Sequence, residues 1–429
     1  MATTRGLGHV VSVVVLFISF AILTNGYTPK RQLNTYLNPG CVKDCGGGLA
    51  YVKARGDMDT LHFVFTTVGT PTALVIRTNT LADREHDRLS FNWDKLRSND
   101  SAGAVYTDNP QTKVLYSYGL MFTRLFQYND TSDDADLSHY SAPSSELTVF
   151  DFLDNVTMWE NLLDTSSDEL IILKIQQTDP DLSTAIMNGS LTIQFHMFDH
   201  EDRADDLPHL QYNEDTTHFD FILQDIDTGN RSNARYGLET IFFSEDADKG
   251  DMTIEDVKSI DDEYSPGVFS INNLLSRPAV KANGGFLQWK PICYMKPARA
   301  RSVATAVKKY GPQTLTAEDK TNTGFVKNSI AYAFYGGHKI IDVKMSYSNF
   351  SFGLSKDGFF TKNNYTAWTG SLGYGVPPAD KVSTLVISVI SAGLGLPVVL
   401  MVFGGLFVCM KNKFGKKAKT TSFSENRIN

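Results

Sequence analysis

A run of 29 residues without a charged side chain, Val382 to Met410, constrains this chain more than any other feature. About 20 residues of α-helix cross a hydrocarbon layer of roughly 30 Å, so the run is long enough to span a membrane. Five lysines follow between Lys411 and Lys419, and positive residues flank the cytoplasmic side of a span. The run therefore predicts a transmembrane helix over 382–410, followed by a short basic cytoplasmic tail over 411–429.

The first 26 residues have the three parts of a secretory signal peptide. A single cation, Arg5, precedes an apolar run from Val10 to Leu23, and the small residues Thr24 and Gly26 follow. This order predicts cleavage near Tyr27 and is more typical of a signal than of a buried N-terminal helix. The two apolar segments together predict a single-pass type I membrane protein whose large domain, residues 27–381, is lumenal or extracellular.

The charge of the chain is unevenly distributed. The formal net charge is −8, and removing one positive charge of the signal and five net positive charges of the tail leaves −14 for the remainder. Nucleic acids and anionic lipids attract cationic surfaces, so a domain this acidic argues against both as partners.

The predicted lumenal domain holds all the glycosylation sequons of the chain. A sequon is an asparagine followed by any residue except proline and then by serine or threonine, and it marks a surface position of a secreted domain. The sequence predicts a heavily glycosylated domain with acceptors at Asn99, Asn129, Asn155, Asn188, Asn230, Asn349 and Asn364.

Four cysteines are present, and Cys409 lies within the predicted span. The lumenal three, Cys41, Cys45 and Cys293, allow one disulfide, which either joins Cys293 to Cys41 or Cys45 or closes the short loop between Cys41 and Cys45. Their spacing matches neither the C-x-x-C redox motif nor a zinc site.

Short segments rich in aromatic and β-branched residues dominate the lumenal part, separated by polar turns. They predict an all-β ectodomain of antiparallel, sandwich-like sheets, with one or two subdomains divided near Ser244 to Tyr264. Helices are expected only over Ile271–Arg277 and Ala298–Gly311. The predicted strands are Leu61–Val68, Thr72–Thr80, Lys113–Tyr128, Leu147–Leu153, Glu169–Gln176, Ser190–Phe198, His218–Ile226, Leu238–Ser244, Ile330–Gly336 and Lys344–Leu354.

The segment "QFHMFDHED" is the first candidate for chemistry. His196 and His200 alternate with Phe198, so both imidazoles can face one side of a strand, with Asp202 continuing the row. Together with His209 and His218 they could bind a divalent metal, but a solvent-facing strand running into an acidic loop explains them better. We expect no metal and no cofactor.

Catalytic motifs do not occur in the sequence. It has no G-x-S-x-G nucleophile elbow and no phosphate-binding glycine motif. Pairs of carboxylates suited to glycosidic chemistry are inevitable in an acidic chain, so their presence decides nothing. We therefore expect a protein that is not an enzyme.

The second candidate is "SIDDEYSPGVF", Ser259 to Phe269. Three consecutive carboxylates, Asp261, Asp262 and Glu263, point alternately to opposite sides of an extended chain and rarely converge on one metal. Tyr264 and Pro266 provide a stiff, aromatic entry into the apolar residues that follow. A structural connection is therefore favoured over an acid cluster.

At these residues the sequence resembles the glycosylated lysosomal membrane protein family. The most specific motif is Ser259, Ile260, Asp261, Asp262, Glu263 and Tyr264, together with "QWKP" inside "GFLQWKPICY". Weaker matching segments follow in order along the chain: "LMFTRLF", "NGSLTIQFHMF", "GNRSNARYGLE", "NFSFG" and "GYGVPPAD".

This resemblance implies a heavily glycosylated type I protein of the lysosomal membrane with an all-β lumenal domain and no enzymatic activity. It further implies an accessory subunit of a lysosomal major facilitator superfamily transporter of dipeptides, which the accessory chain stabilises and shields from lumenal proteases. The glycosylation positions that match the family are Asn188, Asn230 and Asn349.

Family members usually end in a tyrosine-based sorting signal, but Glu425 stands where that tyrosine would be. Sorting by this tail is therefore in doubt. Two alternatives remain open from the sequence, a lumenal acid hydrolase and a cell-surface adhesion or receptor ectodomain.

Overall fold

The protein is described by a computed structural model, and its contacts divide the chain into two units, Met1–Pro378 and Ala379–Asn429. The residues that the structure describes are 30–43, 45, 48–81, 87–142, 144–153, 164–167, 170–176, 189–204, 207, 210–245, 252–261, 267–276, 284–379 and 384–419.

One antiparallel sheet, here called the first sheet, has the strand order β1-β2-β3-β4-β7-β15-β21-β20. The long strand β7 also pairs with β8 beyond the end of β4. The strands are β1 Gln32–Leu37, β2 Leu49–Arg55, β3 Asp59–Thr66, β4 Thr72–Asn79, β7 Val114–Asn129, β8 Leu147–Asp151, β15 Ala234–Ser244, β20 Ala304–Thr314 and β21 Lys344–Phe352.

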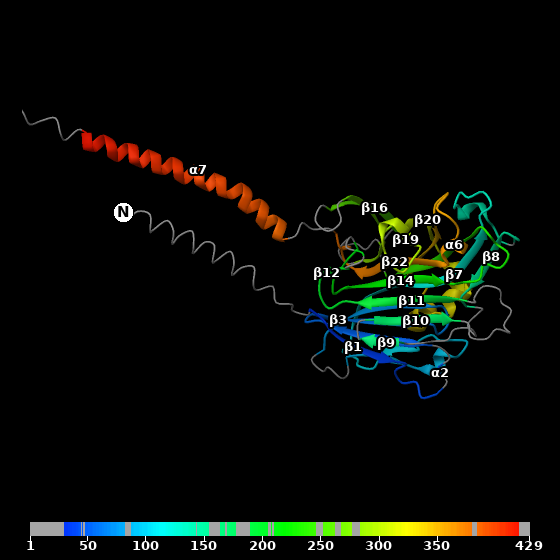
Figure 1. The fold of residues 1–429 in the computed structure, drawn as a ribbon. Helices are drawn as coiled ribbons and strands as arrows, with labels where there is room; N and C mark the ends of the chain where they lie inside the picture. The colour runs from blue at the N-terminus through cyan, green and yellow to red at the C-terminus, as the bar shows by residue number, and fades with distance from the viewer. Residues whose placement is uncertain are drawn as a thin grey trace, which may run out of the picture. The chain divides into compact units, whose positions relative to one another are not determined.

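The second sheet is also antiparallel and has the order β9-β10-β11-β14-β22-β18-β17-β16 (Figure 1). Its short strand β19 pairs with β22 and with the first residues of β20, so β20 belongs to both sheets. The strands are β9 Asp164–Ser167, β10 Leu170–Gln176, β11 Ser190–Met197, β14 Thr216–Gln224, β16 Thr253–Asp261, β17 Gly267–Leu275, β18 Gly285–Trp289, β19 Ile292–Tyr294 and β22 Tyr365–Tyr374.

The main hydrophobic core lies between the two sheets. In β14 the side chains of Phe219 and Phe221 point into it while Asp220 between them points away, as the two-residue period of a strand requires. Phe65 of the first sheet stacks on Phe195 of the second at 4.2 Å, and Phe122 meets Phe219 edge-on at 5.6 Å. Each such buried ring contributes roughly 1.5–3 kcal/mol by removal of apolar surface from water.

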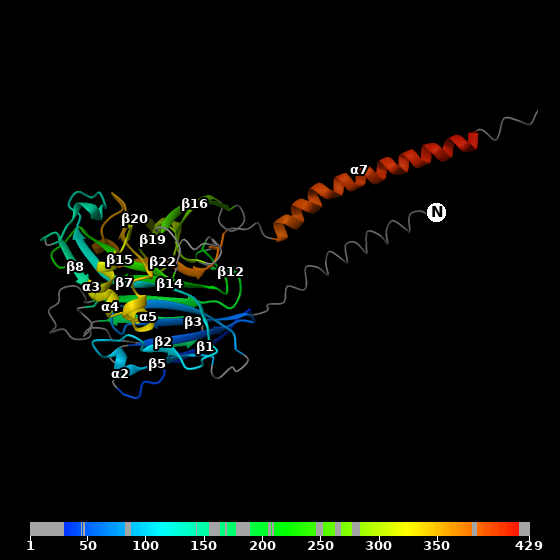
Figure 2. The same cartoon turned by 180° about the vertical axis from the view of Figure 1, so that it is seen from behind.

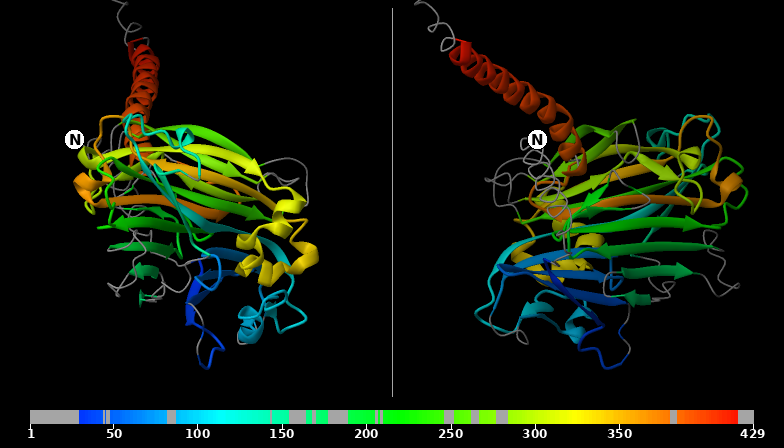
Figure 3. Two further views of the ribbon diagram at one scale, coloured as in Figure 1. Left: turned by 90° about the vertical axis from the view of Figure 1, so that its right-hand side faces the viewer. Right: turned by 60° about the vertical axis from the view of Figure 1, so that its left-hand side comes forward.

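A second apolar layer covers the outer face of the first sheet, where helices and a small hairpin pack on residues such as Leu74 and Met121. Figure 2 and the left view of Figure 3 show α3 to α5 lying against the strands of the first sheet. The covering elements are β5 Leu89–Phe91, α2 Trp93–Leu96, β6 Val105–Thr107, α3 Ala317–Asn322, α4 Gly324–Lys327 and α5 Ile330–Lys339. The remaining short elements of this unit are η1 Leu137–His139, β12 Asp202–Arg203, β13 Gln211–Tyr212, η4 Arg301–Val303 and α6 Phe360–Asn363.

The predicted all-β, sandwich-like fold is confirmed, and nine of the ten predicted strands are found with shifts of a few residues at their ends. The tenth prediction is wrong, because Ile330–Gly336 lies in helix α5. Ser329 caps this helix by accepting a hydrogen bond from the Tyr332 amide, and the helix buries Ile330, Ala331 and Ala333 on the sheet. The aromatic residues of the segment, Tyr332, Phe334 and Tyr335, therefore pack the helix onto the first sheet.

Both predicted helices of the lumenal part are also wrong. Ile271–Arg277 belongs largely to β17, whose residues Asn272–Leu275 pair with β16 on one side and with β18 on the other. Ala298–Gly311 forms η4 and most of β20, where the buried Thr305 and Val307 alternate with more exposed neighbours. Pairing with neighbouring strands overrides local helix propensity at both places.

A subdomain boundary near Ser244–Tyr264 is not observed, since both sheets lie in one compact unit that reaches Pro378. This region instead carries the chain from β15 in the first sheet to β16 in the second.

The second unit contains helix α7, Thr384–Lys419. Its segment Val386–Asn412 is long and apolar enough to cross a membrane, and none of it is buried against other parts of the described chain. This segment agrees with the predicted span over 382–410. The predicted signal peptide, residues 1–26, lies outside the described residues.

Candidate functional site

A cavity lies on the outer face of the second sheet, over β11, β14 and β22. The register places His196 of β11 opposite His218 of β14, and Asp220 of β14 opposite Thr369 of β22. These positions alternate with the core phenylalanines, so their side chains leave the sheet on the side away from the core.

The short strands β12 and β13 and the loop that carries Arg299 contribute the other walls of this cavity, whose volume is about 400 Å³. We call it the outer-face cavity. Its lining residues are His196, Phe198, Asp202, Arg203, Ala204, Leu207, Tyr212, His218, Asp220, Arg299 and Thr369.

Asp220 is the central polar group of the outer-face cavity. One of its oxygens lies 2.7 Å from Arg299 Nη2 and 3.6 Å from His196 Nε2, and the Thr369 hydroxyl donates to the other oxygen. Burial alone would raise the pKa of Asp220, but the hydrogen bond from His196 and the positive charge of Arg299 outweigh it and lower the pKa to about 2. The carboxylate is therefore held in its charged form.

The aromatic side of the cavity is made by Phe198 and Tyr212, whose rings stack with centroids 3.6 Å apart. His218 meets Phe198 edge-on at 4.9 Å, and its Nε2 lies 3.4 Å from the Gln211 carbonyl oxygen. Burial lowers the pKa of His218 to about 4, so this imidazole is neutral except in strong acid.

The histidine cluster considered from the sequence is only partly assembled. His196, His218 and Asp202 line the cavity, whereas His200 pairs with Asp199 at 2.6 Å, and His209 lies outside the described residues. Among the described residues no three histidine, cysteine, aspartate or glutamate side chains gather closely enough to hold a metal ion. The arrangement suits hydrogen bonding more than coordination.

Sequence reasoning did not find Asp220, Arg299, Tyr212 or Thr369 as members of a site. The alternation in "HFDFILQ" shows that Asp220 leaves the sheet on the same side as His218, which is a usable signal. Arg299 and Thr369 lie far along the chain, and only the strand pairing and the loop fold bring them to Asp220.

A separate ionic cluster surrounds Arg235 of β15. Its Nε lies 2.6 Å from an Asp130 oxygen, and its two terminal nitrogens lie 2.8 Å from Asp133 and from Asp357. The Arg235 side chain is 2% exposed and that of Asp130 is fully buried. Gly353 passes so close that a Cβ there would collide with the guanidinium. The cluster fastens three chain segments together and has a structural role.

His62 of β3 is a buried histidine within the first sheet. Its Nδ1 lies 2.8 Å from the Tyr51 hydroxyl and its Nε2 lies 2.9 Å from the Thr78 hydroxyl. Burial, with a smaller contribution from the positive charge of Lys53, lowers the pKa of His62 to about 3. Both ring nitrogens therefore have a hydrogen-bond partner while the ring is neutral.

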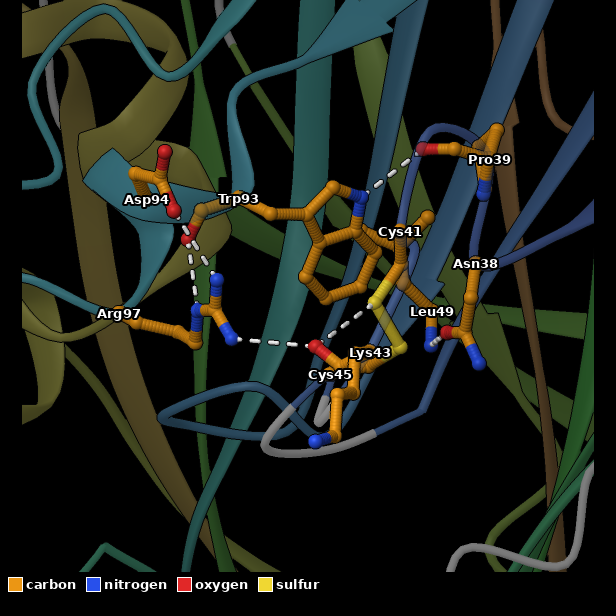
Figure 4. The surroundings of a disulfide bond; sticks show 9 residues. All are labelled: Asn38, Pro39, Cys41, Lys43, Cys45, Leu49, Trp93, Asp94 and Arg97. Carbon is orange, nitrogen blue, oxygen red and sulfur yellow. Dashed lines mark hydrogen bonds and ion pairs between the residues drawn. A yellow bond between two sulfur atoms is a disulfide. The ribbon is translucent and has the colours of Figure 1, made fainter.

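The cysteines pair within the short loop, as one of the sequence alternatives predicted. Cys41 and Cys45 form the disulfide, and Trp93 Nε1 donates to the Pro39 carbonyl beside it at 2.9 Å (Figure 4). Cys293 is a free thiol in the core, and burial raises its pKa. The alternative in which Cys293 is bridged is therefore wrong.

Five of the seven sequon asparagines are among the described residues. Asn99, Asn230 and Asn364 are exposed in turns or loops. Asn129 and Asn349 lie in strands β7 and β21 and are half-buried. Asn155 and Asn188 lie outside the described residues. Glycosylation at these positions stays a prediction.

The segment Ser259 to Phe269 joins β16 to β17. Ser259 pairs with Phe269, Ile260 with Val268, and Asp261 with Gly267, so the segment has the geometry of an antiparallel connection. Phe269 also accepts a cation–π contact from Lys290 at 5.2 Å. Asp262, Glu263 and Tyr264 lie outside the described residues. This position agrees with a structural connection.

The fold and the apolar helix together define a membrane protein with one span and a large antiparallel β domain. The sequence profile of the glycosylated lysosomal membrane protein family matches residues 48–414. Glycosylated lysosomal membrane protein B of Xenopus laevis is 31% identical over 90% of this chain and 91% of its own length. The human glycosylated lysosomal membrane protein is 29% identical over 85% of this chain and 84% of its own length.

The chain belongs to the glycosylated lysosomal membrane protein family. It is accordingly a protein of the lysosomal membrane, with its β domain preceding the membrane helix. This placement favours the lysosome over the cell surface, where the second alternative from the sequence placed the chain.

Proposed function

We propose that this protein is a non-enzymatic accessory subunit of a lysosomal transporter of the major facilitator superfamily that carries dipeptides. In this function the β domain covers lumenal loops of the transporter, stabilises it and shields it from proteases. Membership of the family and the small residues along one side of the membrane helix support the proposal.

The feature that carries the proposal is a small-residue face on α7. Ser388, Ser391 and Gly395 follow one another at spacings of three and four residues, so they lie on one side of the helix. Small residues allow a second helix to approach closely, which is how membrane helices without strong polar groups associate. This face fits a helix of a multi-span partner.

The shielding function has a physical basis in the β domain. Its described strands are paired in two sheets, and a paired strand does not offer its backbone groups to a protease. Glycans on the exposed Asn99, Asn230 and Asn364 would add bulk around it. A rigid, glycosylated cover of this kind protects a partner's loops by steric exclusion.

Purification of the tagged full chain from lysosomal membranes, followed by mass spectrometry, tests the proposal. We expect a multi-span transporter of the major facilitator superfamily to be recovered with the chain, and its half-life to shorten in cells that lack the chain. The double variant Ser391→Leu with Gly395→Leu should reduce recovery by about tenfold, because bulky side chains keep the helices apart.

Leu400→Ile is the matched control for that variant. Leu400 lies nine residues after Ser391 and thus on the opposite side of the helix. Recovery with this variant should equal that of the unchanged chain. Absence of any such transporter from the purified material would refute the proposal.

A further inference from the structure

We propose that the outer-face cavity binds a small neutral ligand rich in hydroxyl groups, such as a monosaccharide or the terminal sugar of a glycan. This inference concerns a different part of the molecule from the membrane helix and does not depend on the transporter partner.

The size and position of the cavity are suited to a ligand. About 400 Å³ lies within the usual range of small-molecule sites. The cavity is separated from the sandwich core by the sheet itself, so it is not a packing defect between the two apolar faces. Two short strands and the Arg299 loop cover a sheet face that would otherwise meet solvent.

The charges of the cavity favour a neutral ligand. Among the described residues, its lining holds two carboxylates, Asp202 and Asp220, and two guanidinium groups, Arg203 and Arg299. A ligand with a net charge would meet groups of both signs, and the ion pair between Asp220 and Arg299 already balances the most buried charges. A hydroxyl group both donates and accepts, so it can bond to carboxylate and guanidinium alike.

The aromatic wall supplies the apolar contact that such a ligand needs. Phe198 and Tyr212 stack beside the polar groups, and both are partly exposed. The C–H faces of a sugar ring pack on apolar surface while its hydroxyls point sideways. Aromatic rings next to side chains of both hydrogen-bonding types match that division.

The buried ion pair also argues for recognition. A buried pair of charges is often no more stabilising than apolar residues of the same volume. Asp220 and Arg299 nevertheless line an open space, where a ligand can reach them. His196 contributes an imidazole that is 37% exposed, and Thr369 contributes a hydroxyl.

Saturation-transfer NMR on the full chain in phosphatidylcholine nanodiscs, free of sugar-based detergent, tests the inference. The chain should carry glycans trimmed to single residues, so that its own sugars cannot fill the cavity. The probes are glucose, galactose, mannose and N-acetylglucosamine, with zwitterionic glycine and anionic inorganic phosphate as comparators. We expect at least one neutral sugar to give a saturable signal.

Two variants locate the binding, and a third is the control. Phe198→Leu removes the aromatic face and Thr369→Val removes a hydroxyl, and each should weaken binding by about tenfold. Gln224→Ala changes an exposed residue of β14 outside the lining and should leave affinity unchanged. Thermal unfolding of each variant establishes that the fold is intact before affinities are compared.

The inference is overturned if no neutral sugar saturates, or if only glycine or phosphate binds. It is also overturned if folded Phe198→Leu and Thr369→Val variants bind sugar as well as the unchanged chain does. None of these outcomes alters recovery of a transporter through the membrane helix, so the two proposals fail separately.

Discussion

Replacing His62 by glutamine should make the stability of the β domain less sensitive to acid. Burial lowers the pKa of His62 to about 3, whereas an unfolded histidine has a pKa of about 6.5. As pH falls below 6.5 the unfolded chain gains a proton that the folded chain does not take up. The contribution of neutral His62 to stability is therefore fully present above the pKa of the unfolded chain, and it is lost as the pH falls toward the pKa of the folded chain.

The magnitude follows from these two values. Between pH 7 and pH 5 the unfolded histidine becomes almost fully protonated while folded His62 stays neutral, which lowers the free energy of unfolding by about 2 kcal/mol. Glutamine does not titrate, so this part of the pH dependence should vanish in His62→Gln. Lost hydrogen bonds to Tyr51 and Thr78 lower stability equally at both pH values and cancel in the comparison.

Guanidinium unfolding of the full chain in nanodiscs, followed by tryptophan fluorescence at pH 7 and pH 5, measures the effect. The buried Trp289 and Trp368 report loss of the core. His338→Gln, at an exposed position of α5, is the matched control and should keep the pH dependence of the unchanged chain. An equal loss of stability between the two pH values in His62→Gln and in the unchanged chain would refute the reasoning.

Three further predictions concern the ionic cluster, the cysteines and the sequons. Arg235→Gln should lower the free energy of unfolding by about 3–5 kcal/mol, because Asp130 is left buried without its cation. Arg301→Gln, at an exposed position, should change it by less than about 0.5 kcal/mol. Denaturant unfolding that gives similar free energies for the two variants would contradict this account. Peptide mapping without reductant should find Cys41 linked to Cys45. Maleimide should label Cys293 only after the protein is unfolded, because the thiol is buried. A peptide that links Cys293 to Cys41 or Cys45 would show the pairing to be wrong. Glutamine at Asn99, Asn230 or Asn364 should each remove one glycan's mass on a gel, and an unshifted band would show that position to be unmodified.

The sequence predicts the architecture well where polar and apolar residues alternate along a strand. In β14 the alternation of His218 and Asp220 with phenylalanines predicts both the strand and its inner face. It fails in β17, where the apolar residues Ile271, Leu274 and Leu275 stand at the three- and four-residue spacings of a helix. It also fails in α5, whose aromatic residues are more typical of a strand.

The outer-face cavity could be predicted only in part. His196 and His218 are recognisable as outward-facing residues from local spacing. The pairing of Asp220 with Arg299 depends on a loop about 80 residues further along, and no local pattern encodes that contact. Strand register and loop conformation, which are properties of the whole fold, determine the composition of the cavity.

The place of β22 in the second sheet has a consequence for biosynthesis. β22 pairs with β14 on one side and with β18 on the other, so the middle of this sheet closes only after the last strand of the lumenal domain arrives. Only a few residues separate Tyr374 from Thr384, where the membrane helix begins. Nearly the whole domain thus enters the lumen of the endoplasmic reticulum before its core can form. Asn129 and Asn349 are half-buried in the finished strands, so we expect any glycan on them to be attached during that interval.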